Sequence, residues 1–578
     1  MKRWVVLKKK ADFTAIGQKY GISPMLARII RNRDICDDKD IGVFLNGTMA
    51  DMHDPALLKD IDKAAERIIK AIDKKEKIRV IGDYDIDGIC SSFILQKSFS
   101  LMGGDVSVKL PDRIADGYGL NRNLIDKAHE DNINLIVTCD NGIAAKSEIE
   151  YAMGLGIDVV VTDHHEVPFE ENNGEKKYIL PPAVAVVDPK QKDCPYPFEG
   201  ICGGMVAYKL IVYITSQSRF SSYCSSFNRE IMEELLVFAA FATVGDVMEL
   251  LDENRIAVKH GLKLIKNCSN QGLRALMEVT GLDKEKITSY DIGFVLGPCM
   301  NATGRLDTAE RALELLNTGD YEKAVLIANE LKELNDSRKN MTIMYTEEAI
   351  EMAEKTEDKV LVLFLPKCHE SLAGIVAGRV RERFYKPTII LTKGSEGIKG
   401  SGRSIDDYNM FEELSKVKEL FTKFGGHKMA AGLSMEESNV GILRQRLNDN
   451  CSLTDEELME KVKIDIDMPI EYATLKLAKE IDMLSPFGVG NPRPLFAQKD
   501  VPFDNLKLLG KNSNVLRMNL YGRTLKAEKC QAEAVIFKDA AETYEKLKDR
   551  STITIAYQVN VNSYMQREKV QIVIQDFI

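Results

Sequence analysis

The sequence has no long hydrophobic run. No stretch approaches the roughly 18 apolar residues that a transmembrane helix requires. Near the N-terminus only Trp4 to Leu7 are apolar before charge returns at Lys8, and a signal peptide needs a longer apolar region. We therefore expect a cytoplasmic protein without membrane association.

Paired cysteines are missing as well. The eleven cysteines are scattered, odd in number and include no Cys-x-x-Cys pair. This usage is typical of reduced thiols in a cytosol and argues against both a disulfide framework and a structural zinc site. The sequence also lacks the Gly-x-x-x-x-Gly-Lys-[Ser/Thr] loop of P-loop NTPases and the Gly-x-Ser-x-Gly elbow of serine hydrolases.

An overall excess of positive charge, which a protein that coats nucleic acid would need, is absent too. The formal net charge is −10. The charge is uneven, however: residues 361–432 carry 12 Lys and Arg against 8 Asp and Glu, and residues 461–578 carry 18 against 15. This distribution favours a carboxylate-rich site combined with local basic grooves.

The 578 residues are enough for roughly three to four domains of about 100–200 residues each. We predict an N-terminal helical segment over 1–75, an α/β domain over 76–305, linking helices over 306–357, a smaller α/β domain over 358–455 and a β-rich domain over 460–578. Several short β-like runs in the last segment suggest a small barrel.

The α/β prediction rests on short apolar runs that alternate with amphipathic stretches. Such runs occur at residues 78–81, 106–110, 133–138, 157–162 and 183–187, with helical patterns between most of them. Strand and helix in alternation predict a mostly parallel sheet covered on both faces. A sheet of this kind binds its ligands at the carboxyl ends of the strands.

Acidic residues and histidines follow three of these predicted strands. A further acid, Asp246, ends an apolar helix. The strand-end residues are Asp83, Asp85 and Asp87, then Asp140, then Asp163, His164 and His165. Neighbouring parallel strands would deliver these side chains to one crevice, where the carboxylates would repel one another. Divalent cations relieve such repulsion, and carboxylates with an imidazole suit Mn²⁺ or Mg²⁺. Two such ions about 3.5–4 Å apart can promote phosphodiester hydrolysis.

Each cluster alone has a plainer interpretation. An Asp-Gly after a strand is commonly only a turn, and Asp-His-His can be a surface loop. The Asp-x-Asp-x-Asp-Gly pattern also mimics an EF-hand loop, but its twelfth position is Ile94 instead of Glu. The occurrence of all the clusters at strand ends favours a common site.

These motifs, taken in order, resemble the DHH phosphoesterase superfamily, and their longer context resembles its RecJ branch. The resemblance covers nearly the whole chain from about residue 40. It is carried by Asp-Tyr-Asp-Ile-Asp-Gly (83–88), Thr-Cys-Asp-Asn-Gly (138–142), Asp-His-His (163–165), Gly-Pro-Cys-Met-Asn-Ala-Thr-Gly-Arg-Leu (297–306), Ser-Gly-Arg-Ser (401–404), Phe-Gly-Gly-His-Lys-Met-Ala-Ala-Gly (424–432) and Phe-Gly-Val-Gly-Asn-Pro (487–492).

The resemblance implies a parallel-sheet DHH domain, a long linking helix, a smaller α/β DHH-associated domain and a C-terminal OB-like barrel. It implies two Mn²⁺ or Mg²⁺ ions held by Asp83, Asp85, Asp87, Asp140, His164 and Asp246. Asp163, His164 and His165 would be catalytic. The implied substrate-binding residues are Asn301, Arg305, His369, Arg379, Ser401, Arg403, Ser404, Gly425, Gly426 and His427.

Several of these residues suit phosphate on chemical grounds. Arg305, Arg379 and Arg403 are natural phosphate partners. Residues 425–427, Gly-Gly-His, are expected to form a flexible loop whose N–H groups cradle a phosphate, although a plain glycine turn is the alternative. Arg381, Arg383 and Lys386 are open to interpretation as phosphate ligands or as a solvated helix face.

The sequence departs from the family pattern at three positions. Cys299 stands where the family usually has Arg, Asp188 where it often has Asn, and Cys368 where a tryptophan is usual. None is an expected metal ligand, so the departures bear on the grip on DNA more than on catalysis.

The function implied by the resemblance is a single-stranded-DNA-specific 5′-to-3′ exonuclease that releases 5′-mononucleotides, in recombination and repair. The alternatives are a DHH phosphodiesterase acting on short oligoribonucleotides or cyclic dinucleotides, and an inactive DNA-binding DHH protein. Family alone suggests a single-strand-binding protein and a RecQ-type helicase as partners, and a monomer. Polarity, pathway and the physiological metal do not follow from the residues.

Overall fold

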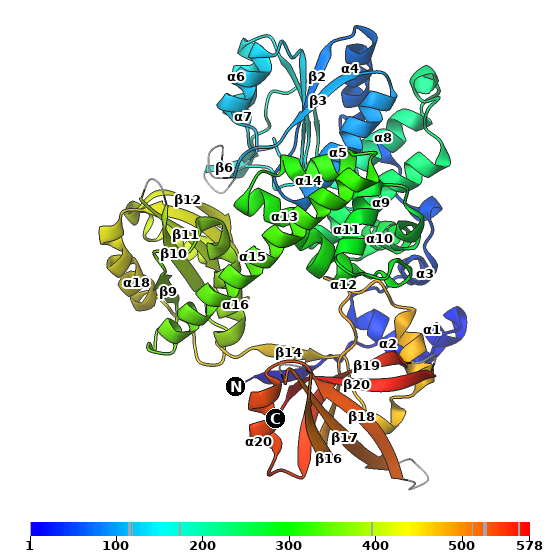
Figure 1. Cartoon of the computed structure of the whole chain (residues 1–578), viewed down its shortest axis with the longest axis vertical. Helices are drawn as coiled ribbons and strands as arrows, with labels where there is room; N and C mark the ends of the chain where they lie inside the picture. The colour runs from blue at the N-terminus through cyan, green and yellow to red at the C-terminus, as the bar shows by residue number, and fades with distance from the viewer. Residues whose placement is uncertain are drawn as a thin grey trace. The chain divides into compact units, whose positions relative to one another are not determined.

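The computed structural model describes residues 2–113, 117, 119–172, 175–394, 397–510, 513–523, 529–564 and 567–578. It divides into two compact units, which are described separately (Figure 1). Unit 1 comprises Asp54–Asp246 and Gly261–Glu460, and unit 2 comprises Lys2–His53, Val247–His260 and Lys461–Ile578. No helix in the described ranges is long and apolar enough to cross a membrane.

Unit 1 contains the predicted parallel sheet. Its five strands lie in the order β3-β2-β4-β5-β8, and every neighbouring pair is parallel. The bounds are β2 (Lys77–Ile81), β3 (Asp105–Lys109), β4 (Leu135–Cys139), β5 (Asp158–Thr162) and β8 (Ala185–Val187). The apolar runs in the sequence therefore predicted the α/β fold correctly, because strands buried on both faces carry few polar residues.

Helices cover both faces of this sheet, as Figure 1 shows. One face is covered by α6 (Arg122–Glu130) and α7 (Lys146–Gly154), whose buried side chains join those of the sheet in one apolar core. The other face packs against α4 (Ile61–Asp73), α5 (Ile86–Leu101) and α8 (Gly203–Ser216). Helix α9 (Arg229–Gly245) packs on α5 and α8. This places the N-termini of α5 and α8 and the C-terminus of α9 around the carboxyl ends of the strands.

The remaining elements of this half of unit 1 are a hairpin and a series of helices. The hairpin is β6 (Phe169–Asn172) with β7 (Glu175–Tyr178), and the helices are α11 (Gln271–Val279), α12 (Ser289–Asp291), the π-helix η6 (Ile292–Leu296), α13 (Gly297–Leu306), α14 (Glu310–Asn317) and α15 (Tyr321–Ala353). Helix α10 (Asp252–Leu264) begins in unit 2 and ends in unit 1. The 33-residue α15 packs against α11 and α13 near its start and against α16 further on.

The second sheet of unit 1 has the order β12-β13-β11-β10-β9, with only β9 and β10 parallel. Its elements are β9 (Leu361–Phe364), α16 (Glu370–Phe384), β10 (Thr388–Gly394), β11 (Gly397–Arg403), α17 (Met410–Ser415), β12 (Phe421–His427), β13 (Ala430–Met435) and α18 (Val440–Asp449). Strands β11 and β12 contain several glycines, which are uncommon in strands and give little sequence signal for them.

Unit 2 is built around a barrel. The strands follow the order β15-β16-β17-β18-β20-β19, and pairing between β16 and β19 closes it. The bounds are β14 (Lys461–Ile464), β15 (Ile466–Asp467), α19 (Leu475–Asp482), β16 (Phe496–Leu509), β17 (Val515–Arg523), β18 (Lys529–Ile536), α20 (Ala540–Leu547), β19 (Thr552–Tyr564) and β20 (Arg567–Phe577). The predicted OB-like barrel is confirmed.

The chain start also belongs to unit 2. Its elements are β1 (Arg3–Val6), α1 (Phe13–Tyr20), α2 (Pro24–Asn32) and α3 (Asp38–Asn46). The sequence predicted helices here, and β1 differs: it pairs in parallel with β14. Side chains of α2 and α3 share one apolar core with the barrel strands.

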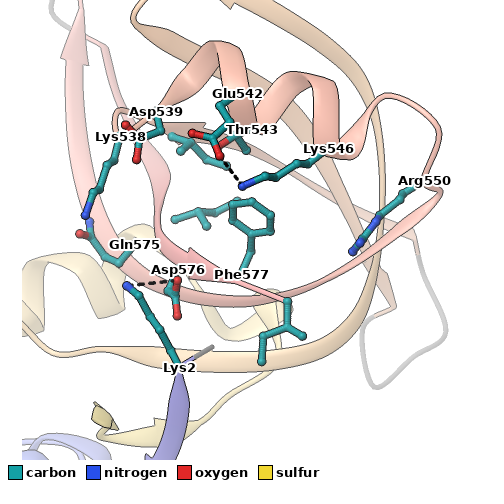
Figure 2. Close-up of a pocket in the computed structure, with 13 residues that line it drawn as sticks. Lys2, Lys538, Asp539, Glu542, Thr543, Lys546, Arg550, Gln575, Asp576 and Phe577 are labelled. Carbon is teal, nitrogen blue, oxygen red and sulfur yellow. Dashed lines mark hydrogen bonds and ion pairs between the residues drawn. The ribbon is translucent and has the colours of Figure 1, made fainter. Parts of the chain in front are cut away.

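A pocket of about 530 Å³ opens on the barrel beside α20 (Figure 2). Its lining mixes apolar side chains such as Phe577 with two ion pairs, Lys2–Asp576 and Lys546–Glu542. None of the candidate site residues lines it.

Candidate active site

The first acidic cluster lies in the loop between β2 and α5. Asp85 caps α5, because its Oδ1 accepts hydrogen bonds from the N–H groups of Asp87 and Gly88. A Cβ at position 88 would lie 2.3 Å from the carbonyl oxygen of Asp83, so the loop closes this tightly only with glycine there. The three carboxylates are thereby gathered at the start of one helix.

Asp87 is held by a second helix. Its two carboxylate oxygens accept hydrogen bonds from the N–H groups of Gly203 and Gly204, each at 2.7 Å. These are the first two residues of α8, where unpaired N–H groups and the helix dipole favour an anion. The helix start therefore fixes the position of the Asp87 side chain, which is fully buried.

Asp140 follows β4 in a constrained conformation. Its φ is +61°, in the left-handed region that Asp and Asn tolerate better than most residues. Its Cβ would be 2.8 Å from a Cβ at position 203, so the glycine of α8 permits the approach. Backbone strain of this kind, held by close packing, is common at functional sites.

The Asp-His-His segment follows β5. Asp163 accepts hydrogen bonds from three N–H groups, those of Ile143, His164 and His165. Its Oδ1 also lies 2.7 Å from Nδ1 of His165. Burial alone would raise the pKa of Asp163, but the hydrogen bond and charge of His165 outweigh it and lower that pKa. Burial would lower the pKa of His165, yet Asp163 raises it to about 9. Asp163 therefore orients the segment.

His164 points at the other acids. Its Nε2 lies 3.0 Å from a carboxylate oxygen of Asp140, 3.5 Å from one of Asp87 and 3.7 Å from one of Asp246. Burial lowers the pKa of His164, which favours the neutral imidazole that binds metals. Its Nδ1 is buried and, among the described residues, has no hydrogen-bond partner.

Among the residues that the structure describes, three groups of side chains have ligand atoms within 4.8 Å of one another. The groups are Asp83 with Asp85 and Asp140, Asp87 with His164 and Asp246, and Asp140 with His164 and His165. All six residues predicted to hold metal thus lie close together. Asp140 belongs both to the group with Asp83 and Asp85 and to the group with His164 and His165. Such oxygen-rich sets with one imidazole are suited to Mn²⁺ and Mg²⁺.

These six residues form the acidic cluster, and its electrostatics favour the binding of divalent cations. Burial, reinforced by neighbouring carboxylates, raises the pKa of Asp83, Asp85 and Asp140. The same causes raise the pKa of Asp246 to about 8. Asp83 Oδ1 is buried and finds no hydrogen-bond partner in the described part of the chain. A cation would supply the missing partner and relieve the repulsion.

This electrostatic balance gives a pH prediction. Protons compete with metal ions for carboxylates whose pKa is raised, and the pKa of Asp246 is about 8. Mn²⁺ affinity should therefore rise steeply from pH 6 to pH 8 and level off above, by about tenfold per pH unit for each proton displaced. Calorimetric titration in buffers of different ionisation enthalpy measures both affinity and proton release. An affinity independent of pH, with no proton released, would contradict the assignment.

An arginine cluster lies beside the acids. Burial, together with the charges of Arg113 and Arg338, lowers the pKa of Arg305 to about 10. Burial and Arg113 also lower the pKa of Arg403. Guanidinium groups gathered this closely are suited to an anion such as phosphate. The sequence had pointed to Arg305 and Arg403.

Sequence reasoning missed Arg113 and Arg338. Arg113 follows β3 at the same edge of the sheet as the acids, and its guanidinium lies 4.8 Å from the ring centre of Tyr84. Its position after a strand was a usable signal. Arg338 is in the middle of α15, where its charge helps to lower the pKa of Arg305. No motif marks it.

The other predicted substrate residues divide into two groups. Asn301 and Ser404 make internal bonds: Asn301 Oδ1 accepts from the N–H of Ile86 at 2.7 Å, and the buried Ser404 hydroxyl donates to the carbonyl of Tyr408. His369 Nδ1 is 2.7 Å from the hydroxyl of Ser371, whose carbonyl accepts from Arg305. The remaining residues are at least partly exposed: Arg379, Ser401, Arg403, Gly425, Gly426 and His427.

The Gly-Gly-His segment is not a loop. Residues 425–427 end strand β12 and pair with β13. Gly426 has φ +149°, and a Cβ there would lie 2.3 Å from the carbonyl oxygen of Ala430. Glycine thus permits a close hairpin, which is why the pair of glycines reads as a loop in the sequence.

Comparison with known proteins gives matches along most of the chain. Three family profiles match: "DHH family, N-terminal domain" at residues 77–243, "DHHA1 domain" at 357–453 and "RecJ OB domain" at 464–576. The single-stranded-DNA-specific exonuclease RecJ of Bacillus subtilis is 34% identical over 99% of this chain and 70% of its own length. The protein of that name from Escherichia coli is 32% identical over 86% of this chain and 87% of its own length.

Solved structures agree with these sequence matches. RecJ from Thermus thermophilus in complex with Mn²⁺ superposes with a TM-score of 0.81 at 26% identity, covering 100% of this chain and 79% of that one. Its complex with Mg²⁺ has the same fold, with a TM-score of 0.76 at 24% identity and coverage of 100% and 78%.

Proposed function

Because the chain belongs to the RecJ family of single-stranded-DNA-specific exonucleases, we propose that it degrades single-stranded DNA from the 5′ end and releases 5′-mononucleotides. The chain is a metal-dependent hydrolase that uses Mn²⁺ or Mg²⁺. The observation that carries the proposal is the close grouping of metal-binding side chains around Asp140, next to an arginine cluster. This is the combination that cleavage of an anionic phosphodiester requires.

In this proposal Asp83, Asp85 and Asp140 hold one ion, and Asp87, His164 and Asp246 hold the other. When bound, two such ions activate water and stabilise the leaving oxygen. The chain's own residues do the rest. Asp163 orients His165, which is protonated at neutral pH because its pKa is about 9. The side chain of His165 is 44% exposed, so it can donate a hydrogen bond to an oxygen of the scissile phosphate.

The arginine cluster would position the 5′ end of the strand. The charge of Arg113 contributes to the lowered pKa of both Arg305 and Arg403, and a phosphate among them would offset that repulsion. Arg305 of α13 links the part of unit 1 with the parallel sheet to the part with the second sheet. Its guanidinium donates a hydrogen bond to the carbonyl of Ser371 in α16. Binding of a terminal phosphate there would set which phosphodiester reaches the acidic cluster.

The test is cleavage of three substrates in Mn²⁺: a 5′-labelled single strand, the same strand as a duplex, and a dinucleotide RNA. We expect immediate release of labelled mononucleotide from the single strand and none from the duplex. Cleavage of the dinucleotide alone would move the protein to the short-RNA phosphodiesterases. Labelled mononucleotide that appears only after a lag would instead indicate degradation from the 3′ end.

Family membership also suggests the biological setting. We include in the proposal a role in recombination and repair, a contact with single-strand-binding protein, cooperation with a RecQ-type helicase, and a monomer that works in the cytoplasm. Co-sedimentation with purified single-strand-binding protein, with and without DNA, tests the contact directly.

A further inference from the structure

Two aromatic rings on unit 1 are stacked but not buried. Tyr290 and Phe294 have ring centroids 4.7 Å apart and an interplanar angle of 25°. They are 64% and 66% exposed, although an aromatic pair usually contributes to stability through burial. Their spacing of four residues puts them on one face of a helical segment. Stability does not account for this pair, because most of its surface stays in water.

The helix that carries this aromatic pair rests on the acidic cluster. It runs through α12, the π-helix η6 and α13 without a break. A Cβ at Gly297 would lie 3.1 Å from Ile86, which separates Asp85 from Asp87. Four residues further along, Asn301 accepts the hydrogen bond from the N–H of Ile86. The aromatic pair is thus attached through a rigid element to the loop that gathers the carboxylates.

The other side of the same helix rests on α9. A Cβ at Gly293 would lie 3.7 Å from a methyl group of Val244, two residues before Asp246. The π-turn belongs to this stretch: the N–H of Gly297 bonds to the carbonyl of Ile292, and such turns are frequent at functional sites. From Phe294 to Asn301 the helix rises about 10 Å, or about three nucleotide steps of a stacked strand.

We propose that Tyr290 and Phe294 form a stacking platform for the bases of single-stranded DNA, about two to four nucleotides from the scissile phosphate. This inference rests on the proposed function, whose substrate must continue outward from the acidic cluster. An exposed ring binds any base, because every base has a π-face, and so suits an enzyme without sequence preference. In a duplex both faces of each base are covered by neighbours, so the platform favours a single strand.

The test compares two pairs of exposed aromatic residues. The first variant is Tyr290→Ala with Phe294→Ala. The matched control is Phe169→Ala with Tyr178→Ala on the β6–β7 hairpin, where Lys176 and Lys192 already lie 4.2 Å and 6.0 Å from the ring centres. For each protein, kcat and KM are measured on a single strand of about 20 nucleotides and on a dinucleotide too short to reach the platform.

We expect the first variant to raise KM for the long strand by about 10- to 100-fold, the equivalent of stacking one base. Its kcat and its rate on the dinucleotide should stay unchanged, as should all values for the control. Exchanging the rings, Tyr290→Phe with Phe294→Tyr, should restore KM. An unchanged KM, or an equal loss on both substrates, would overturn the platform.

A binding measurement separates this inference from the proposed function. In the Asp140→Asn background, 2-aminopurine is placed at successive positions of a single strand, and its fluorescence is quenched where it stacks. Quenching should be lost in the Tyr290→Ala/Phe294→Ala protein only for positions a few nucleotides from the bound end. If wild-type protein cleaves no DNA, the proposed function fails. The position-specific quenching still shows whether bases stack on Tyr290 and Phe294. Uniform quenching at all positions would refute it.

Discussion

Replacing Asp140 by asparagine is expected to lower kcat on single-stranded DNA by at least about 10³-fold. Asp140 offers a ligand atom to two of the three groups in the acidic cluster, and in the proposed two-ion arrangement the loss of its charge would remove several kcal/mol of charge stabilisation. Asparagine keeps the φ of +61° that Asp140 adopts, because it tolerates the left-handed region. The loss would therefore report the missing charge and not a distorted loop. Binding of DNA, which we propose rests on the arginines, should persist.

The same variant should be more stable than wild type when metal is chelated. Burial and neighbouring carboxylates raise the pKa of Asp140, so its folded state holds a proton that the unfolded chain releases. The resulting destabilisation of the wild type grows as pH rises above the unfolded value near 4, and asparagine removes it. Mn²⁺ should then raise the melting temperature of the wild type but barely that of the variant.

The control for Asp140→Asn is Glu166→Gln. Glu166 is the residue after His165, its side chain is 88% exposed, and it pairs with Lys190 outside the acidic cluster. The substitution removes one carboxylate next to the site and changes none of the proposed metal-binding side chains. Retained cleavage in Asp140→Asn, or equal losses in both variants, would refute the two-ion arrangement.

The sequence predicted which acidic residues and histidines lie close together wherever they follow a strand. Parallel strands bring their carboxyl ends to one edge, so Asp83, Asp140 and His164 could be grouped from position alone. Asp246 was found because it ends an apolar helix. Arg338 could not be found in this way, since only the packing of α15 brings it near Arg305. The stacked rings of Tyr290 and Phe294 likewise look like ordinary core residues in a sequence.

The fold could be predicted where apolar periodicity is strong and short in range. It could not be predicted where distant segments combine. Strand β1 pairs with β14, some 460 residues later, and no local pattern indicates that partner. Residues 247–260 fall within the α/β domain predicted over 76–305, yet they pack in unit 2. Arg255 contributes to this packing, because its hydrogen bonds reach residues far away in the chain.

Replacing Arg255 by leucine is expected to destabilise unit 2 by about 3–5 kcal/mol or more. The side chain is among the largest that are fully buried, and its guanidinium stacks 3.9 Å from the ring centre of Phe44. It donates to backbone carbonyls of two other chain segments, at Phe44 and at the consecutive residues Leu484, Ser485 and Pro486, and so joins three segments including its own. Leucine would leave those buried acceptors without a donor, at about 1–3 kcal/mol each. Such a loss is a large part of a typical total stability of about 5–15 kcal/mol.

Hydrogen exchange of the full chain under increasing urea measures this loss unit by unit. In Arg255→Leu the amides of unit 2 should exchange at lower urea than in wild type, while those of the parallel sheet in unit 1 keep their protection. Arg255→Lys should recover little, because one ammonium cannot reach the acceptors on both of the other segments. Arg550→Leu is the matched control, since this arginine of unit 2 is exposed and surface changes usually cost less than about 0.5 kcal/mol. If Arg255→Leu exchanges like that control, the guanidinium does not hold these three segments together, and the apolar core that α2 and α3 share with the barrel must suffice.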